Sequence, residues 1–354
     1  MGLTLPKLVP GWIYCIRDED YLDGSMGRFV KIGLTSRTVD IRISEHQTGN
    51  PRKEISEYDI ELELMNYAET YLHHYFSQDR IAGEWFDMDT TRVMSEVEPI
   101  LQTFKTEMAA EKPNFNQWSA LTTTLSNGII DSPTSSETAL HQLYLIAHEN
   151  LTLAEAQHKI HDNNLRALVG ISGGIEGVLK LNESIKNDTF RRTIFDTLVT
   201  PAQLAQCDET ITKLKGSLSV TGGRKIDELD AVLNTQLIAS ASSITNPPNL
   251  SNLGRAETPL IQTIKNEHMA WLGTRRQVKV TEWECLKLKA QIVVALGPRQ
   301  SITNIVTWRR YMDTKTTFNN KKAKELFEVD YNASFAPVPN GMSVIISDSR
   351  KYNP

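Results

Sequence analysis

Cysteine is scarce in this sequence, and its few residues indicate neither a disulfide framework nor a metal site. The 354 residues include three cysteines, which lie far apart and form no CxxC pair: Cys15, Cys207 and Cys285. A secreted scaffold held by disulfides has an even number of more closely spaced cysteines. We therefore expect the fold to depend on ordinary hydrophobic cores.

Long apolar runs are also missing. No uninterrupted apolar stretch approaches the ~18 residues that a membrane helix needs, and the N-terminus lacks a signal-peptide pattern. Two glycine groups, at 170–174 and 222–223, lack the flanking residues of a phosphate-binding loop. With 40% hydrophobic residues, the chain is long enough for two or three domains. We expect a cytoplasmic protein without a membrane partner.

Three short stretches near the N-terminus carry the chemical signal. They are GWIY at 11–14, VKIG at 30–33 and GEWF at 83–86. The apolar run at 12–16 predicts a central strand that contains Tyr14.

Two helices are predicted between these stretches. Residues 37–46 favour a helix that carries Arg42 and is capped by Thr35 or Ser36. In residues 67–76, apolar side chains recur at helical spacing and place Glu69 at the edge of a buried stripe.

Hydrolysis of a phosphodiester bond requires the side chains that these elements present. The reaction needs an attacking water, a cation that neutralises the phosphoryl oxygens, and help for the leaving 3′-oxygen. A carboxylate such as Glu69 holds a metal ion, and the phenol of Tyr14 positions the water or accepts its proton. The planar fork of Arg42 can grip two phosphate oxygens.

The segment from Gly11 to Phe86 resembles the GIY-YIG endonuclease superfamily, most closely the phage-associated branch with KIG and GEWF motifs. The resemblance implies a small α/β sandwich with a short antiparallel sheet, one Mg²⁺ or Mn²⁺ ion, and hydrolysis of DNA in a bacterial or phage-infected cell. It further implies catalytic roles for Tyr14, Lys31 and Arg42 and a metal-binding role for Glu69. We add the neighbouring His46 as a catalytic candidate.

Two features depart from the pattern of the superfamily. Lys31 stands where better-known branches have a phenol, and residues 18–28 lengthen the gap between the first two motifs. A lysine of lowered pKa can still move a proton, whereas an ordinary lysine offers only charge. Glu84 fits either a second metal-facing carboxylate or a solvated strand residue.

Other interpretations of the same residues remain open. Tyr14 is also compatible with a tyrosine at the edge of a core, and Trp85 and Phe86 favour packing on a strand. Three histidines, His46, His73 and His74, suggest zinc, but no cysteine lies near them and their spacing matches no common structural site. For these histidines we favour packing or phosphate contact.

Charge is segregated along the chain. Residues 1–111 contain 11 basic and 20 acidic residues, a formal charge of −9, whereas residues 258–354 contain 15 basic and 8 acidic residues, a charge of +7. Because affinity for nucleic acid rests largely on neutralising phosphates, the basic C-terminal third is the better candidate for binding DNA, which we expect to be double-stranded. The alternative is an ordinary surface with scattered lysines.

Polar and proline-containing stretches predict the domain boundaries. A helix from Asp89 to Ala110 is expected to close the first domain, before Lys112-Pro113. We expect an α+β protein with five parts: a nuclease-like domain at 1–111, a linker at 112–136, a mainly helical domain at 137–241, a linker at 242–256 and a small basic α/β module at 257–354.

The C-terminal part has its own order of elements. A helix is expected to end at Gly273, and an amphipathic helix at 281–296 to end before Gly297-Pro298. A strand at 305–310 and a helical segment at 318–331 follow. This order resembles the tail of YqaJ-type phage recombination exonucleases, without their catalytic core. The residues expected to contact nucleic acid are Arg275, Arg276, Trp308, Arg309, Arg310, Lys321 and Lys322.

Two functions agree with these observations. One is a metal-dependent DNA endonuclease encoded by a phage or mobile element. The other is a DNA-binding or partner-binding protein that retains the fold without turnover, an alternative that the substitution at Lys31 favours.

Overall fold

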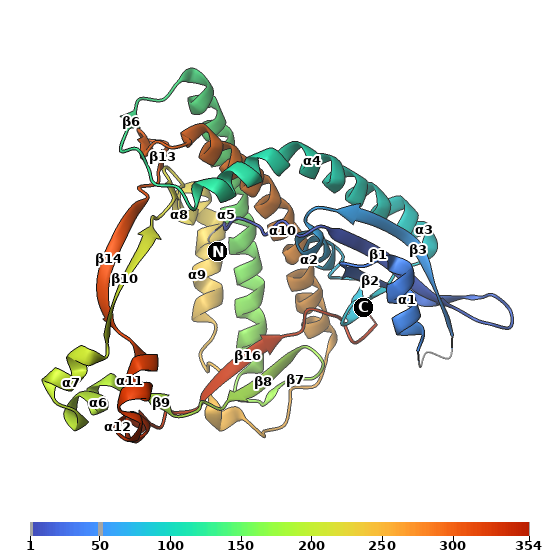
Figure 1. Ribbon diagram of the computed structural model, residues 1–354. Helices are drawn as coiled ribbons and strands as arrows, with labels where there is room; N and C mark the ends of the chain where they lie inside the picture. Colours follow the sequence, from blue (N-terminus) through green and yellow to red (C-terminus); the bar gives the residue numbers. More distant parts are fainter. Residues whose placement is uncertain (1–2, 49–51, 354) are drawn as a thin grey trace.

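The N-terminal third of the protein forms a five-stranded antiparallel sheet with the strand order β3-β1-β2-β5-β4 (Figure 1). The computed structural model describes residues 3–48 and 52–353. The strands are β1 (Gly11–Glu19), β2 (Met26–Thr35), β3 (Lys53–Leu62), β4 (Arg80–Ala82) and β5 (Trp85–Asp87). The expectation of a mixed α+β protein with an N-terminal antiparallel sheet is confirmed.

The central strand β1 is buried on both faces. Ile13 and Cys15 belong to the main core with helix α2 (Met65–Tyr75), whereas Tyr14 and Ile16 pack with residues of helix α1 (Val39–Gln47). Successive side chains of a strand point to opposite faces, so an uninterrupted apolar run fits a strand covered on both sides. The helices α1 and α2 therefore lie on opposite faces of the sheet.

The helix after the sheet is longer than its sequence predicts. Beyond α3 (Thr90–Arg92) and the π-helical turn η1 (Val93–Val97), helix α4 runs over Glu98–Leu121. It passes through Pro113. The expected helix end at Ala110 and the expected linker from residue 112 are therefore wrong. A proline inside a helix removes one hydrogen bond. Burial of Phe115, Trp118 and Leu121 in the core offsets that cost.

Two 35-residue helices pack along each other in the middle of the molecule, α5 (Ser135–Val169) and α10 (Gln262–Leu296). The expected helix end at Gly273 is wrong, because α10 continues through it. A Cβ at that position would come within 2.8 Å of Gln78 Nε2, so glycine permits close contact with the N-terminal domain. The helix ends before Gly297, as expected, where φ is +57°.

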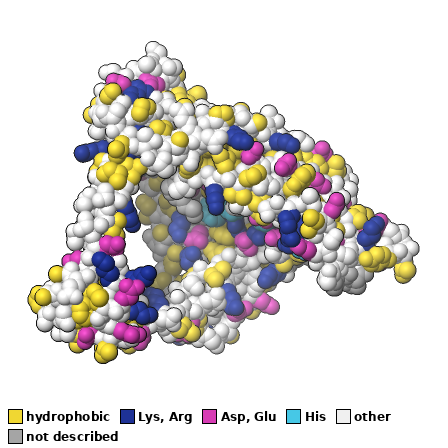
Figure 2. Space-filling view, viewed as in Figure 1, with side chains coloured by type: hydrophobic (Ala, Val, Ile, Leu, Met, Phe, Trp, Pro, Cys, Tyr) yellow, Lys and Arg dark blue, Asp and Glu magenta, His cyan; other side chains and the backbone are white. Residues whose placement is uncertain are grey.

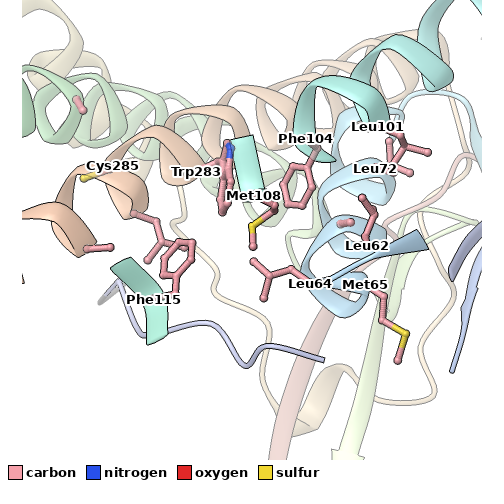
Figure 3. Close-up of a cluster of buried hydrophobic side chains, with 14 of the residues drawn as sticks. Leu62, Leu64, Met65, Leu72, Leu101, Phe104, Met108, Phe115, Trp283 and Cys285 are labelled. Atoms are coloured by element: carbon pink, nitrogen blue, oxygen red, sulfur yellow. The ribbon is translucent and has the colours of Figure 1, made fainter. Parts of the chain in front are cut away.

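The main core continues from the sheet through α4 into α10. The ring of Trp283 on α10 stacks on Phe104 of α4 with centroids 4.7 Å apart, and Phe115 lies on its other side at 6.1 Å (Figure 3). Leu62, Leu64 and other side chains of the N-terminal domain belong to the same cluster. The N-terminal sheet is thus joined to the long helices by apolar contacts across the expected boundary at residue 111.

The middle and C-terminal parts interleave. The region 137–241, expected to be mainly helical, contains strands as well as helices: the end of α5, β7 (Gly174–Ile175), β8 (Leu179–Ser184), β9 (Thr189–Phe190), α6 (Arg192–Leu198), α7 (Pro201–Gln206), β10 (Asp208–Lys215), β11 (Ser219–Val220), α8 (Ile226–Leu229) and α9 (Ala231–Ser242). The remaining elements are β6 (Ile130–Asp131), the 3-10 turn η2 (Leu250–Asn252), β12 (Ser301–Ile302), β13 (Val306–Thr307), β14 (Tyr311–Phe318), α11 (Asn320–Leu326), α12 (Glu328–Ala333), β15 (Phe335–Ala336) and β16 (Gly341–Ile346).

Strands from these two parts pair with each other in four small sheets. β16 pairs with β8, which pairs with β7, and β10 pairs with β14 in a two-stranded ribbon. The ribbon leads from the sheet β11-β13-β12-β6 to a separate group of short helices, α6, α7, α11 and α12 (Figure 1). None of the helices in the described part of the chain combines the length and the apolar character needed to cross a membrane.

Candidate active site

Six polar side chains from the N-terminal domain come together at the sheet. β1 and β2 contribute one each, α1 two, α2 one and the turn between β4 and β5 one, and we call this group the polar cluster: Tyr14, Lys31, Arg42, His46, Glu69 and Glu84. In the β1–β2 register, Tyr14 lies opposite Gly33 and Ile16 opposite Lys31. Opposed residues share a face, which puts Tyr14 and Lys31 on the side covered by α1.

Tyr14 and Arg42 form one half of the cluster. Burial raises the pKa of the Tyr14 hydroxyl, and a hydrogen bond from the Arg42 guanidinium opposes part of that rise. The phenol therefore stays protonated at neutral pH. A Cβ at position 33 would come within 2.6 Å of the Tyr14 oxygen, so Gly33 of the KIG motif is the residue that leaves room for this ring.

The helix that carries Arg42 begins later than expected. Its N-cap is Thr38, and neither Thr35 nor Ser36 caps it. Arg42 and His46 are four residues apart, so both lie on the same face of α1.

Lys31, His46 and Glu84 form a second contact group. Lys31 Nζ lies 3.1 Å from His46 Nε2 and 3.3 Å from Glu84 Oε2. Burial lowers the pKa of His46, and the positive charges of Lys31 and Arg42 lower it further. The imidazole is therefore neutral at neutral pH and accepts a hydrogen bond from the Lys31 ammonium.

Glu69 is the carboxylate whose ionisation the site opposes most. Burial raises its pKa to about 7, and the nearby Glu84 carboxylate contributes to the rise, whereas Arg80 and Lys31 act in the opposite direction. A divalent cation bound at such a pair of carboxylates would stabilise their ionised forms. Among the residues that the structure describes, no group of three or more His, Cys, Asp or Glu side chains is arranged to hold a metal.

The three histidines that suggested zinc face different partners. His73 Nε2 is 2.9 Å from the Ile32 carbonyl oxygen, and His74 Nε2 is 3.1 Å from Arg275 Nη2. His46 contacts Lys31 as described above. The structure therefore does not bring them to a common site, and His73 instead ties α2 to β2.

Arg80 is a member of the site that the sequence did not indicate. Its charge lowers the pKa of Glu69, and its Nη1 forms an ion pair with Asp348 near the C-terminus, 2.6 Å away. Arg80 belongs to no motif, and its partner lies 268 residues further along the chain. No local pattern could have paired them.

Two of the residues expected to contact nucleic acid are buried. Trp308 is 6% exposed and belongs to the main core, and Arg310 is 2% exposed with its guanidinium 4.4 Å from the Trp308 ring centroid. Arg310 Nη2 also donates to the Gly297 carbonyl at 2.9 Å. The expected base stacking by Trp308 and phosphate contact by Arg310 are wrong for this conformation, because both side chains hold the end of α10.

The other expected contacts differ in their exposure. Arg276 and Arg309 are exposed beside tyrosine rings, and Lys321 is exposed on α11. Lys322 is partly buried and donates to the Asp208 carbonyl, and Arg275 is partly buried in a cavity wall.

Comparisons with known proteins add no relative. No family model matches the sequence, and the chain has no match among curated proteins or solved structures.

Proposed function

We propose that this protein is a metal-dependent endonuclease that hydrolyses DNA phosphodiester bonds, with the polar cluster as its active site. The observation that carries the proposal is that the phenol, lysine, arginine, histidine and carboxylates singled out from sequence meet at one place. Their motifs resemble those of the GIY-YIG superfamily, and a sheet covered by α1 and α2 on opposite faces agrees with the sandwich that the resemblance implies. The phage-associated branch of that resemblance favours an origin in a phage or mobile element.

The donor set fits Mg²⁺ or Mn²⁺. Mg²⁺ prefers carboxylate oxygens and often needs only one or two of them, with water and substrate phosphate completing its shell. Glu69 would hold the ion, and Glu84, which also contacts Lys31, would assist. When bound, the ion would neutralise charge on the phosphoryl oxygens and the leaving oxygen.

The other side chains of the cluster have complementary roles. Tyr14 is a protonated phenol, so it orients the attacking water by hydrogen bonding. His46 is neutral and would accept a proton from that water once its acceptor nitrogen is released from Lys31, while Arg42 and Lys31 offer charge to the phosphate. A base with a lowered pKa suits hydrolysis near neutral pH.

The coupling between Tyr14 and Arg42 provides a test. We expect Tyr14→Phe and Arg42→Lys each to slow single-turnover nicking of supercoiled DNA by about 10²-fold, as loss of a positioning hydroxyl or an oxyanion donor commonly does. Because the two side chains share a hydrogen bond, the double variant should be much less than 10⁴-fold slower, an order-of-magnitude statement from the non-additivity of coupled residues.

A matched control is Arg28→Lys, which alters an exposed arginine paired with Asp87 on the same domain. Its nicking rate should equal that of the unaltered protein. Unchanged rates in both Tyr14→Phe and Arg42→Lys would instead show that these residues serve the core edge alone.

DNA is the proposed partner, and the exposed cations of the C-terminal third are its proposed contacts. Each phosphate neutralised on duplex DNA contributes about 0.9 to the slope of log affinity against log salt. We expect the double variant Arg309→Ala, Lys321→Ala to reduce that slope by roughly 1 to 2 units, measured by fluorescence anisotropy. The control Lys159→Ala removes an exposed lysine of α5 and should leave the slope unchanged.

A protein that binds DNA without cleaving it is the second candidate. The contact of Lys31 with both His46 and Glu84 favours it, because this lysine is then engaged within the protein. Salt-dependent DNA binding with no cleavage in Mg²⁺ or Mn²⁺ would establish this second function.

A further inference from the structure

A cavity of about 810 Å³ lies beside the polar cluster, where the N-terminal domain meets the long helices. Its wall includes residues of α2, α5, α10, β8 and β16 and the turn between β4 and β5. Figure 2 shows a recess near the middle of the molecule with histidine and charged side chains inside it. The volume falls within the roughly 300 to 1,000 Å³ of small-molecule sites.

Arg275 in this wall carries a positive charge that forms no ion pair with the described residues. Its Nη1 is enclosed and has no hydrogen-bond partner, and its guanidinium carbon lies 5.1 Å from the Trp271 ring centroid. In the described part of the chain no carboxylate forms an ion pair with it. Asp348 attracts Arg275 electrostatically without forming an ion pair with it, and a partly buried cation in this position favours binding of an anion.

The partner that Arg275 does have carries no charge. Burial and, to a smaller extent, the charge of Arg275 lower the pKa of His74 to about 3, so the ring is neutral and its Nε2 accepts the hydrogen bond from Arg275 Nη2. Within residues 3–48 and 52–353, the rim lysines Lys180 and Lys351 also form no ion pair.

The acidic side chains of the cavity are mostly neutralised within the protein. Glu282 pairs with Lys279 at 2.9 Å, and Asp348 pairs with Arg80 at 2.6 Å. Glu257 is the remaining acid in the wall. Among the described residues, the cavity wall therefore contains three cations without ion-pair partners, Arg275, Lys180 and Lys351, and one carboxylate without such a partner, Glu257.

Another part of the wall is apolar. It is formed by side chains from β7, β8 and β16 and the turn between β7 and β8: Ile175, Val178, Leu179, Ile345 and Ile346. A ligand that fits both parts carries an anionic group and a weakly polar body.

We propose that this cavity binds a nucleotide, with its phosphate on Arg275 and its base against the apolar wall. Gly83 lines the cavity, and the next residue is Glu84 of the polar cluster, so a bound nucleotide would lie next to the proposed cleavage site. The choice of a nucleotide over another organic anion rests on the proposed function, whereas the anion site itself does not. The nucleotide is either free or part of the DNA strand at the active site.

Calorimetric titration of the full-length protein with a deoxynucleoside monophosphate tests the proposal. We expect saturable binding, weakened roughly 10- to 100-fold in Arg275→Gln, the effect expected for loss of hydrogen bonds from a charged donor. The nucleoside without phosphate should bind at least about tenfold more weakly, for the same reason. The control Arg224→Gln removes an exposed arginine paired with Glu149 and should bind like the unaltered protein.

A second variant keeps the test decisive if Arg275→Gln does not fold. Lys180→Glu reverses an exposed charge at the rim and should also weaken binding. Absence of saturable binding to the unaltered protein, or equal affinity in Lys180→Glu and every folded Arg275 variant, would overturn the proposal.

Competition separates the two sources of the nucleotide. Displacement of the monophosphate by a short single-stranded oligonucleotide supports a nucleotide of the DNA strand, and lack of displacement supports a free nucleotide. Cleavage of DNA is measured separately, so DNA cleavage without nucleotide binding overturns only the cavity proposal. Nucleotide binding without cleavage removes only the nuclease assignment.

Discussion

The Glu69→Gln variant is expected to lose nicking of supercoiled DNA in Mg²⁺ by a factor of about 10³ or more. Glutamine keeps the size of the side chain but removes the charge that would hold the ion. A metal supplies several kcal/mol of transition-state stabilisation, and each 1.4 kcal/mol corresponds to about tenfold in rate. The control is Glu61→Gln, an exposed glutamate of β3 outside the polar cluster.

The same variant should be more stable than the unaltered protein in the absence of metal. In the folded protein the pKa of Glu69 is raised to about 7, whereas in the unfolded chain it has its ordinary value of 4.5. As the pH rises from 4.5 to 7, the unfolded chain therefore loses the carboxyl proton before the folded protein does. Stability therefore falls over that interval, and the penalty is complete above pH 7. Discounted for partial exposure, we expect Glu69→Gln to gain roughly 1 to 2 kcal/mol at pH 8 and almost nothing at pH 4.

Urea unfolding with and without Mg²⁺ measures this effect. Added Mg²⁺ should stabilise the unaltered protein and leave Glu69→Gln unchanged. Undiminished nicking by Glu69→Gln would remove this residue from the mechanism and direct attention to Glu84. Equal stabilities at pH 8 would contradict the burial and charge repulsion seen at Glu69.

Replacement of Arg17 by methionine is expected to have the largest effect on stability. Arg17 is 1% exposed on β1, and its Nε and Nη2 donate to the Glu57 carboxylate at 2.7 and 3.0 Å. Its other bonds go to the carbonyl oxygens of Gly27, Arg28 and Met88, at 2.8 to 3.0 Å. All five N–H groups are thereby used, and removing one partner of a buried ion pair costs about 3 to 5 kcal/mol.

Chemical denaturation followed by circular dichroism measures the loss. The double variant Arg17→Met, Glu57→Leu should recover part of it, since no carboxylate then remains buried without a partner. The control Arg37→Met breaks the exposed pair with Glu45 and should cost at most about 1 kcal/mol. If Arg17→Met lowered the free energy of unfolding by no more than the control Arg37→Met does, the structural role of the buried pair would be contradicted.

The polar cluster was predictable because its members lie on short, strongly patterned elements. Strand alternation and the β1–β2 hairpin put Tyr14 and Lys31 on one face, and a four-residue spacing puts Arg42 and His46 on one side of α1. These relations depend on local geometry alone. The sequence could not show that Lys31 contacts both His46 and Glu84, because the turn that carries Glu84 is placed by pairing between β2 and β5.

The failed predictions share a different cause. Pro113 and Gly273 are local signals for the end of a helix, but tertiary packing of α4 and α10 outweighs them. Trp308 and Arg310 are residue types that often contact nucleic acid, yet in this fold Trp308 packs in the main core and Arg310 is buried beside it, bonded to the Gly297 carbonyl after α10. Arg17 shows the same limit, because its partner Glu57 is fixed by the pairing of β1 with β3. Long-range contacts decide these positions.

Incubation of the purified full-length protein with supercoiled plasmid in Mg²⁺, Mn²⁺ or EDTA tests the central claim most directly. The Glu69→Gln variant, purified in parallel, controls for a contaminating nuclease. We predict nicked or linear products with either metal, none with EDTA, and none with the variant. Cleavage that persists in EDTA, equal cleavage by both proteins, or intact plasmid under every metal condition would contradict the assignment of the polar cluster as a metal-dependent nuclease site.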